Sequence, residues 1–205
     1  MTKNTRSRNL YFNRTDVFSY LKEYVGSIAY GLNRIDHVQL VAAMAAIADC
    51  HHIMRAAVYV GGNGGSAAIA DHLLCDFTKG TCIENKQGIR VINLGGSPAL
   101  LTAIANDLGY QHTLSFPLQT FEINPQDVVI LISSSGNSPN IIEAATLTKK
   151  RGSKLIGLTG FDGGELRKMA DISLHVPVNN YGVIEDCHQA IMHTMAQFHY
   201  LSLNE

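Results

Sequence analysis

The feature that most constrains the fold is an uninterrupted apolar run, Val128–Ile132, in the middle of the chain. A strand with one face in water alternates apolar and polar residues, whereas a strand that is apolar at every position is buried on both faces. Strands of that kind occur in parallel sheets that helices cover on both sides. The run therefore predicts the central strand of a parallel sheet in an α/β protein.

The rest of the chain alternates between predicted strands and helices, as this architecture requires. Short apolar runs predict strands at 57–60, 89–94, 127–132, 154–159 and 171–176, and helical patterns separate them. Such alternation with short crossovers favours helices on both faces of the sheet. We therefore expect a three-layer αβα sandwich around a five-stranded parallel sheet, of the flavodoxin or Rossmann type.

Two amphipathic helices are predicted ahead of the first strand. One begins after Asp16 and continues to Leu32, and the other covers about 37–55. They need an apolar surface, and the sequence leaves open whether the sheet or a partner subunit provides it. We expect residues 1–14 to form a flexible N-terminal arm and residues 15–205 to form a single domain, because no linker or second core is visible.

Composition excludes several classes of partner. The formal net charge is −1, so no overall positive field attracts nucleic acid. No run approaches the roughly 20 apolar residues of a membrane span. We therefore expect neither nucleic acid nor a membrane as a direct partner. The four cysteines form no CxxC pair, which favours a reduced, cytoplasmic protein; they are Cys50, Cys75, Cys82 and Cys187.

A glycine-rich turn follows the first predicted strand. The stretch Ala57–Ser66 contains four glycines and Asn63 in its last six residues, and a helical pattern starts at Ser66. Glycines allow a ligand to approach the backbone, and the first N–H groups of a helix are unpaired. The turn is therefore either an anion site or an ordinary tight turn that binds nothing, and both interpretations stay open on this stretch alone.

A serine-rich turn follows the central strand. Ser133, Ser134, Ser135 and Ser138 place four hydroxyls at the carboxyl end of a strand and the start of a helix. Hydroxyls and helix N–H groups can surround a phosphate without a basic side chain. Serine also caps helices and forms turns, but one cap needs fewer than four serines. The turn therefore predicts a phosphate site, and no G-x-x-x-x-G-K-[ST] P-loop is present.

These turns, with Leu158-Thr159-Gly160, Asp162-Gly163-Gly164 and a terminal helix that contains histidines, occur in an order that resembles the sugar isomerase (SIS) domain family. Within that family the chain is most similar to the phosphoheptose isomerases, over about residues 15–203. The resemblance implies a homotetramer with sites at subunit junctions. It also implies conversion of sedoheptulose 7-phosphate to D-glycero-D-manno-heptose 7-phosphate through an enediolate, for surface polysaccharide (lipopolysaccharide or capsule) synthesis.

The resemblance also implies site residues. Asn63, Gly64, Gly65, Ser66 and the four serines of the second turn would bind the substrate phosphate, and Asp107 would contact sugar hydroxyls. Asp76 would act as base or acid, with His193 as its partner across the subunit junction. A zinc ion would be held by four side chains, His72, Asp76, Glu185 and His193. Alternatively, these are scattered polar residues on solvated or subunit-facing helix surfaces, which for any single histidine is the better interpretation.

Among the departures of this chain from the pattern that it resembles, two substitutions fall in the implied metal site. Asp76 stands where the family has glutamate, and Glu185 stands where it has glutamine. Three hypotheses follow: a heptose-phosphate isomerase, an isomerase of a different sugar phosphate, and a non-catalytic phosphosugar-binding protein that acts through protein partners, as relatives that bind a replication initiator do. Retention of His193 opposite an acid favours catalysis. A sugar-sensing transcription regulator is disfavoured, since no helix-turn-helix domain precedes the sugar domain.

Overall fold

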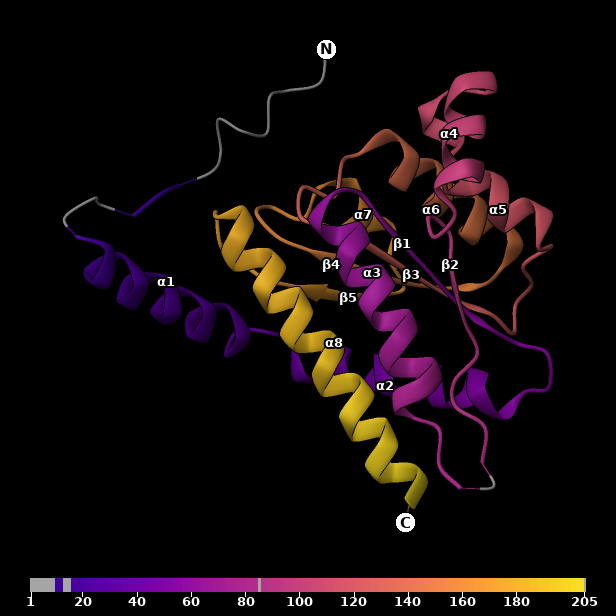
Figure 1. Cartoon of the computed structure of the whole chain (residues 1–205), viewed down its shortest axis with the longest axis horizontal. Helices are drawn as coiled ribbons and strands as arrows, with labels where there is room; N and C mark the ends of the chain where they lie inside the picture. Colours follow the sequence, from indigo (N-terminus) through magenta and orange to yellow (C-terminus); the bar gives the residue numbers. More distant parts are fainter. Residues whose placement is uncertain (1–9, 13–15, 85, 205) are drawn as a thin grey trace.

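The computed structural model describes residues 10–12, 16–84 and 86–204. Five parallel strands form one sheet in the order β2-β1-β3-β4-β5 (Figure 1). The predicted fold class and number of strands are confirmed, and β3, the apolar run, is central. The strands are β1 (Val58–Gly62), β2 (Val91–Asn93), β3 (Val128–Ser133), β4 (Lys154–Thr159) and β5 (Ile172–His175).

The register of the sheet brings the carboxyl ends of the three middle strands together. Gly62 of β1 pairs with Ile132 of β3, and Ser133 of β3 pairs with Thr159 of β4. In an open parallel sheet this edge is where ligands bind. The glycine turn and the serine turn therefore leave the sheet side by side.

Helices α2 (His37–His52), α3 (Gly65–Cys75) and α8 (Tyr181–Asn204) cover one face of the sheet. Alternate residues of the strands, such as Val60 and Ile130, pack against them in the larger of two hydrophobic clusters. Helices α3 and α8 run next to each other across the front of the molecule in Figure 1. This neighbourhood matters because α3 and α8 carry the predicted histidines.

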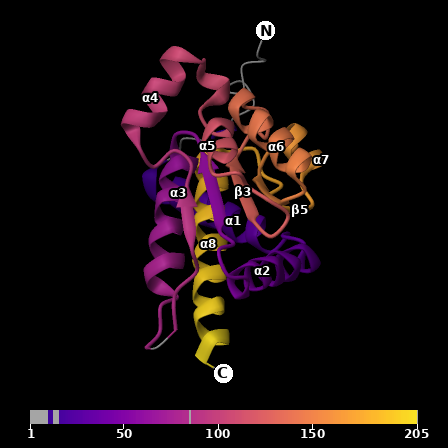
Figure 2. The same cartoon turned by 90° about the vertical axis from the view of Figure 1, so that its right-hand side faces the viewer.

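The opposite face of the sheet carries a smaller hydrophobic cluster. Tyr59, Val129 and Leu131, which alternate with the residues of the first face, pack here against residues of α5, α6 and α7. Figure 2 shows α6 and α7 on one side of the sheet and α4 extending away from the body. These elements are α4 (Pro98–Asp107), the 3₁₀ turn η3 (Tyr110–His112), α5 (Ser115–Thr120), α6 (Pro139–Arg151) and α7 (Gly164–Met169).

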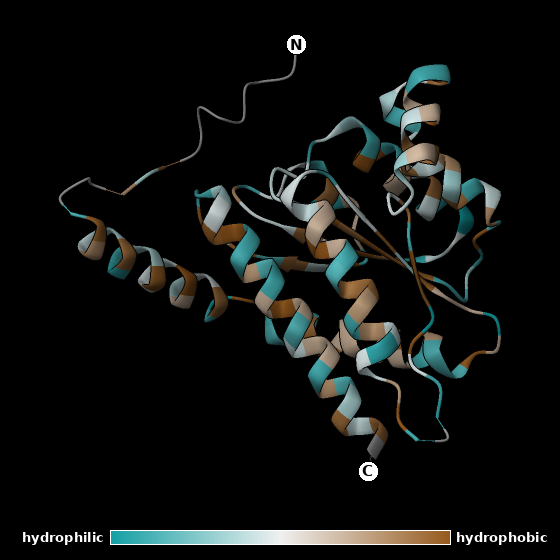
Figure 3. Cartoon of the chain, in the orientation of Figure 1, coloured by the Kyte–Doolittle hydropathy of each residue, from teal (hydrophilic) through white to brown (hydrophobic). Residues whose placement is uncertain are grey.

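The two N-terminal helices use different surfaces. Helix α2 buries Ala43, Ile47 and Cys50 in the larger cluster, so it covers the sheet. Helix α1 (Val17–Leu32) packs along α8, and only Gly31 of α1 is fully buried. Most of the apolar face of α1 is left exposed, and its brown residues stand clear of the body in Figure 3.

Helix boundaries follow local chemistry. The Asp16 carboxylate accepts hydrogen bonds from the N–H groups of Phe18 and Ser19, which caps α1 as predicted. Helix α2 ends at His52, earlier than the predicted 55, and Arg55 has a positive φ of 75°. The helix predicted to start at Ser66 changes character within its length. Asp76 begins a π-helical turn, η2 (Asp76–Gly80), of a kind that is frequent at functional sites.

Most of the predicted N-terminal arm, residues 1–9 and 13–14, lies outside the described residues. Residues 10–12 are held by the body rather than loose. The Leu10 N–H donates to the Asn179 carbonyl at 2.7 Å, the Asn180 side chain donates to the Leu10 carbonyl, and Phe12 packs edge-on against Tyr20. Within the described ranges, no helix combines the length and apolarity needed to span a bilayer.

Candidate active site

A pocket of about 180 Å³ lies between the glycine turn and the serine turn. It is bordered by Asn63, Ser66 and all four serines of the second turn, together with Ile132, Tyr181 and Glu185. Ser66 lies in the first turn of α3 and Ser138 is the N-cap residue of α6, so two helix N-termini border the pocket. Unpaired N–H groups and hydroxyls at that position suit an oxyanion such as phosphate.

The glycine turn is built so that no side chain obstructs it. Gly64 has a φ of 56°, which favours glycine, and a Cβ on Gly62 would lie 2.6 Å from the backbone carbonyl carbon of Ser66. The start of α3 therefore packs directly against the end of β1. Gly64 and Gly65 flank the pocket, whereas Asn63 and Ser66 line it.

The four serines of the second turn have two roles. Some hydroxyls stabilise the turn through hydrogen bonds, and others have no such bond and border the pocket. The hydroxyl oxygens of Ser133 and Ser135 accept backbone N–H groups within the turn. Ser138 makes no side-chain capping bond. Among the described residues, four buried side-chain atoms have no hydrogen-bond partner, and the Ser134 hydroxyl is one of them. A buried hydroxyl without a partner at a pocket wall is consistent with a ligand that supplies one.

Asn63 is fixed by neighbours that the sequence prediction missed. Its side-chain amide and that of Asn140 exchange two hydrogen bonds of 2.8 Å, and the Tyr110 hydroxyl donates to the Asn63 oxygen at 2.9 Å. Asn140 is fully buried. A polar residue in the first turn of a predicted helix was the only signal for Asn140. The network fastens the glycine turn to α6.

Glu185 occupies a different place from the predicted metal site. Its carboxylate borders the phosphate pocket, and a Cβ on Gly65 would lie 2.3 Å from it. It therefore sits at the N-terminus of α3, where the helix dipole favours a negative charge. Burial and the nearby Asp186 raise the pKa of Glu185. The structure thus puts a carboxylate next to the predicted phosphate.

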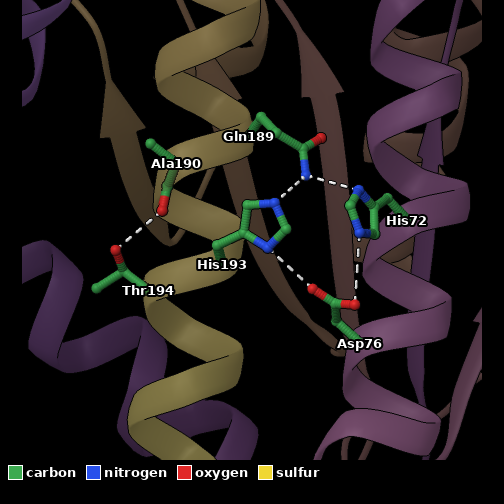
Figure 4. A network of polar contacts seen from close by, with 6 residues as sticks. All are labelled: His72, Asp76, Gln189, Ala190, His193 and Thr194. Atoms are coloured by element: carbon green, nitrogen blue, oxygen red, sulfur yellow. Dashed lines mark hydrogen bonds and ion pairs between the residues drawn. The ribbon is translucent and has the colours of Figure 1, made fainter.

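The other three predicted metal ligands come together between α3 and α8 (Figure 4). His193 Nδ1 lies 2.9 Å from one oxygen of Asp76, and His72 Nε2 lies 3.5 Å from the other. One ligand atom from each residue falls within 4.8 Å of the others. His72 and Asp76 meet because i and i+4 share a helix face, and His193 comes from the neighbouring helix.

This arrangement corrects one expectation. The Asp76–His193 contact forms within one chain, so His193 needs no subunit junction to reach the acid. Gln189, one turn before His193 on α8, was missed by the sequence prediction. Its side-chain nitrogen lies 2.9 Å from His72 Nδ1 and 2.9 Å from His193 Nε2. Spacing of i and i+4 between Gln189 and His193 was a signal that could have identified it.

The donor set of this cluster fits a divalent transition metal. Two imidazole nitrogens and one carboxylate are typical zinc ligands, and three protein ligands leave an open position, as in catalytic zinc sites. The side chains are 47%, 27% and 38% exposed for His72, Asp76 and His193. Solvent or a substrate can therefore reach the group directly.

Asp107, which was predicted to contact the sugar, and His188 of α8 both lie outside the pocket. Asp107 is exposed at the end of α4, accepts a bond from the adjacent Asn106 side chain, and does not border the pocket. His188 is fully buried beneath α8, where its Nε2 lies 3.2 Å from the Thr159 carbonyl. Burial lowers the pKa of His188 to about 4, so it is a neutral core residue.

Comparison with known proteins gives a consistent family. The SIS domain family model matches residues 23–160. A phosphoheptose isomerase from Aliarcobacter butzleri is 40% identical over 136 residues, which cover 66% of this chain and 71% of that protein. The solved phosphoheptose isomerase of Neisseria gonorrhoeae superposes with a TM-score of 0.80 at 30% identity, over 89% of this chain and 96% of that one. The enzyme from Francisella tularensis gives 0.81 at 27% identity, over 89% and 95%.

Proposed function

Since the chain belongs to the SIS domain family, and within it to the phosphoheptose isomerases, we propose that it converts sedoheptulose 7-phosphate to D-glycero-D-manno-heptose 7-phosphate. The observation that carries this proposal is that one helix, α3, joins the two halves of the site. Ser66 borders the phosphate pocket, and His72 follows it by six residues, which is about 9 Å along a helix. A long sugar phosphate extended along α3 suits that separation.

The Asp76–His193 pair supplies the proton transfers that isomerisation needs. Asp76 takes a proton from C1 of the open-chain ketose, and an imidazole N–H gives a proton to the oxygen on C2, which yields the enediol. The hydroxyl on C1 then loses its proton while C2 gains one, and the product is the aldose. A protein that only binds phosphosugars has no need of this pair, which disfavours the non-catalytic alternative.

We include zinc in the proposal as the metal held by His72, Asp76 and His193. When bound, it would supply positive charge for the oxygens of the enediolate, a role that an imidazole N–H takes in the metal-free protein. The phosphate is held by Ser66, Ser133, Ser134, Ser135 and Ser138, with the N-termini of α3 and α6. Gly64 and Gly65 leave room for it, and Asp107 reaches sugar hydroxyls only if the α4 end or another subunit moves towards the pocket.

We further propose that the protein is a homotetramer in the cytoplasm. Apolar side chains on α1 and α2 are more than half exposed in the single chain, and a partner subunit would cover them; they are Val17, Phe18, Leu21, Val25, Val38 and Val41. The four cysteines are unpaired, which suits a reducing compartment. Light scattering in solution is expected to give four times 22.3 kDa, and a monomer would contradict the assembly.

A direct assay tests the activity. Protein is incubated with sedoheptulose 7-phosphate, with and without added zinc, and aldose formation is followed. Asp76→Asn is expected to lower kcat/KM by about 10²–10⁴-fold, because it removes the base. Asp71→Asn, on the same helix, is the matched control, since Asp71 contacts Asn93 and does not border the pocket. No turnover by the unmodified protein would reject this substrate, and a panel of shorter ketose phosphates would then test the alternative isomerases.

A further inference from the structure

Gln189 closes a ring of four polar groups. In Figure 4 its amide lies on one side of the two imidazoles and the Asp76 carboxylate lies on the other. His72 faces Gln189 with Nδ1 and Asp76 with Nε2, whereas His193 faces Gln189 with Nε2 and Asp76 with Nδ1. Each imidazole nitrogen of the two histidines therefore faces a partner within this group of four residues.

The carboxylate determines the tautomer of each histidine. An ionised Asp76 only accepts hydrogen bonds, so the nitrogens that face it, His72 Nε2 and His193 Nδ1, carry the protons. A neutral imidazole then has a lone pair on its other nitrogen. Both lone pairs point at the Gln189 side-chain NH₂, which has two hydrogens to donate, and both contacts measure 2.9 Å. Three contacts in the metal-free group are therefore hydrogen bonds of 2.9 Å, and the fourth, between His72 Nε2 and Asp76, is a longer ion-pair contact of 3.5 Å.

A metal on the Asp76 side needs the opposite tautomers. It would bind the lone pairs of His72 Nε2 and His193 Nδ1, so the protons would move to the nitrogens that face Gln189. Two N–H groups would then point at the amide, and only its oxygen, which has two lone pairs, can accept both. If the Gln189 amide rotates by half a turn, it therefore exchanges the hydrogen bonds that suit the metal-free site for those that suit the metal-bound site.

We propose that Gln189 is a positioning residue that selects the histidine tautomers, with its nitrogen towards both rings in the metal-free protein and its oxygen towards both rings when a divalent metal is bound. The inference rests on the metal part of the proposed function and on no step of the isomerisation. Partners that orient metal-binding histidines in this way contribute about 10–100-fold to metal affinity. Carboxylate and carbonyl partners can only accept a hydrogen bond from the histidine. An amide can donate to it in the metal-free state and accept from it in the metal-bound state.

Metal affinity gives the first test. Chelator-treated protein is titrated with Zn²⁺ in competition with a chromophoric chelator, without substrate. Gln189→Leu removes both hydrogen bonds at similar size and is expected to weaken zinc binding about 10–100-fold. Gln189→Glu, which only accepts, is expected to bind zinc at least as tightly as the unmodified protein. Gln119→Leu, at an exposed position of α5, is the matched control. Equal affinities of the unmodified protein and Gln189→Leu would overturn the proposal, as would absence of zinc binding.

Histidine tautomers give the second test, by long-range ¹H–¹⁵N NMR of protein labelled at histidine. In the metal-free protein His72 is expected as the Nε2–H form and His193 as the Nδ1–H form, and zinc is expected to reverse both. Gln189→Leu should lose the fixed tautomers before zinc is added. Unchanged tautomers on zinc binding would overturn the proposal. Because neither measurement uses substrate, a protein without isomerase activity that passes both would reject the proposed reaction and leave the role of Gln189 intact.

Discussion

At the scale of single residues, the most informative group is the Ser134 hydroxyl, which is buried and unpaired at the pocket wall. Ser134→Ala removes a group that has no partner to lose, so the free energy of unfolding is expected to change by less than about 0.5 kcal/mol. One hydrogen bond to a phosphate is lost, so the Kd for sedoheptulose 7-phosphate is expected to rise about 10-fold or more. Calorimetric titration and urea unfolding measure the two quantities.

Ser153→Ala is the matched control for that variant. The Ser153 hydroxyl donates to the Asn124 carbonyl at 2.7 Å, away from the pocket. Its removal is expected to cost about 1 kcal/mol of stability and to leave the Kd unchanged. If Ser134→Ala behaved like Ser153→Ala, the Ser134 hydroxyl would have no role in phosphate binding.

The Glu185 carboxylate is expected to repel a phosphate in the pocket, because both groups carry negative charge. Its carboxylate and a phosphate would share one pocket, and the described lining residues include no lysine or arginine to offset them. Glu185→Gln removes one negative charge and is expected to lower the Kd for sedoheptulose 7-phosphate about 10-fold at neutral pH and low salt. Since burial raises the pKa of Glu185, the difference between variant and unmodified protein should shrink as the pH falls.

Titration at two pH values and two salt concentrations measures this effect. Glu143→Gln, on the exposed side of α6, makes the same change of charge away from the pocket and is the control. Weaker binding by Glu185→Gln than by the unmodified protein would instead mean that the carboxylate contacts the substrate favourably, for instance through sugar hydroxyls.

At the scale of elements, the start of α6 depends on one glycine. Gly136 has a φ of 62°, and a Cβ there would lie 1.9 Å from the Gly163 carbonyl oxygen. Gly136→Ala therefore combines an unfavourable backbone conformation with a backbone clash and is expected to cost about 2–4 kcal/mol of unfolding free energy. The serine turn would shift with it, so the Kd for substrate should rise as well.

Gly26→Ala is the contrasting change, because nothing lies within 4 Å of a Cβ on that α1 residue. Alanine is the better helix former, and a gain of about 0.5–1 kcal/mol is expected. Chemical denaturation of both variants gives the comparison. Equal effects would show that the turn tolerates a side chain at Gly136.

At the scale of the whole molecule, buried His188 links stability to pH. Burial lowers its pKa in the folded protein to about 4, from 6.5. Between those values the unfolded chain binds the extra proton, so stability is complete above about pH 6.5 and falls as the pH drops towards 4. The shift corresponds to a loss of up to about 3 kcal/mol from this residue.

Urea unfolding at several pH values from 7.5 to 4.5 measures that slope. His188→Gln keeps a donor for the Thr159 carbonyl. It is expected to reduce the dependence of the unfolding free energy on pH by the equivalent of about one bound proton. His37→Gln at the exposed start of α2 is the matched control. An identical slope in His188→Gln and the unmodified protein would show that other groups carry the acid sensitivity.

The sequence alone determined the sheet, because its signal is local. Continuous apolarity in Val128–Ile132 implied burial on both faces, and the glycine and serine turns followed strands whose ends must share an edge. Burial patterns and turn chemistry are properties of short stretches, so they can be interpreted without the partners that satisfy them. The helix pair His72 and Asp76 was predictable for the same reason, from i,i+4 spacing.

Tertiary structure decided which distant side chains meet. The orientation of α8 relative to α3 places Gln189 and His193 next to His72 and directs Glu185 to the phosphate pocket. Glu185 and His193 reach these different sites although they lie only about two turns apart on one helix. Tertiary structure also determined that α2 packs on the sheet and that most of the apolar face of α1 stays exposed. Such choices depend on helix packing angles and on contacts more than a hundred residues apart, and no local pattern encodes them.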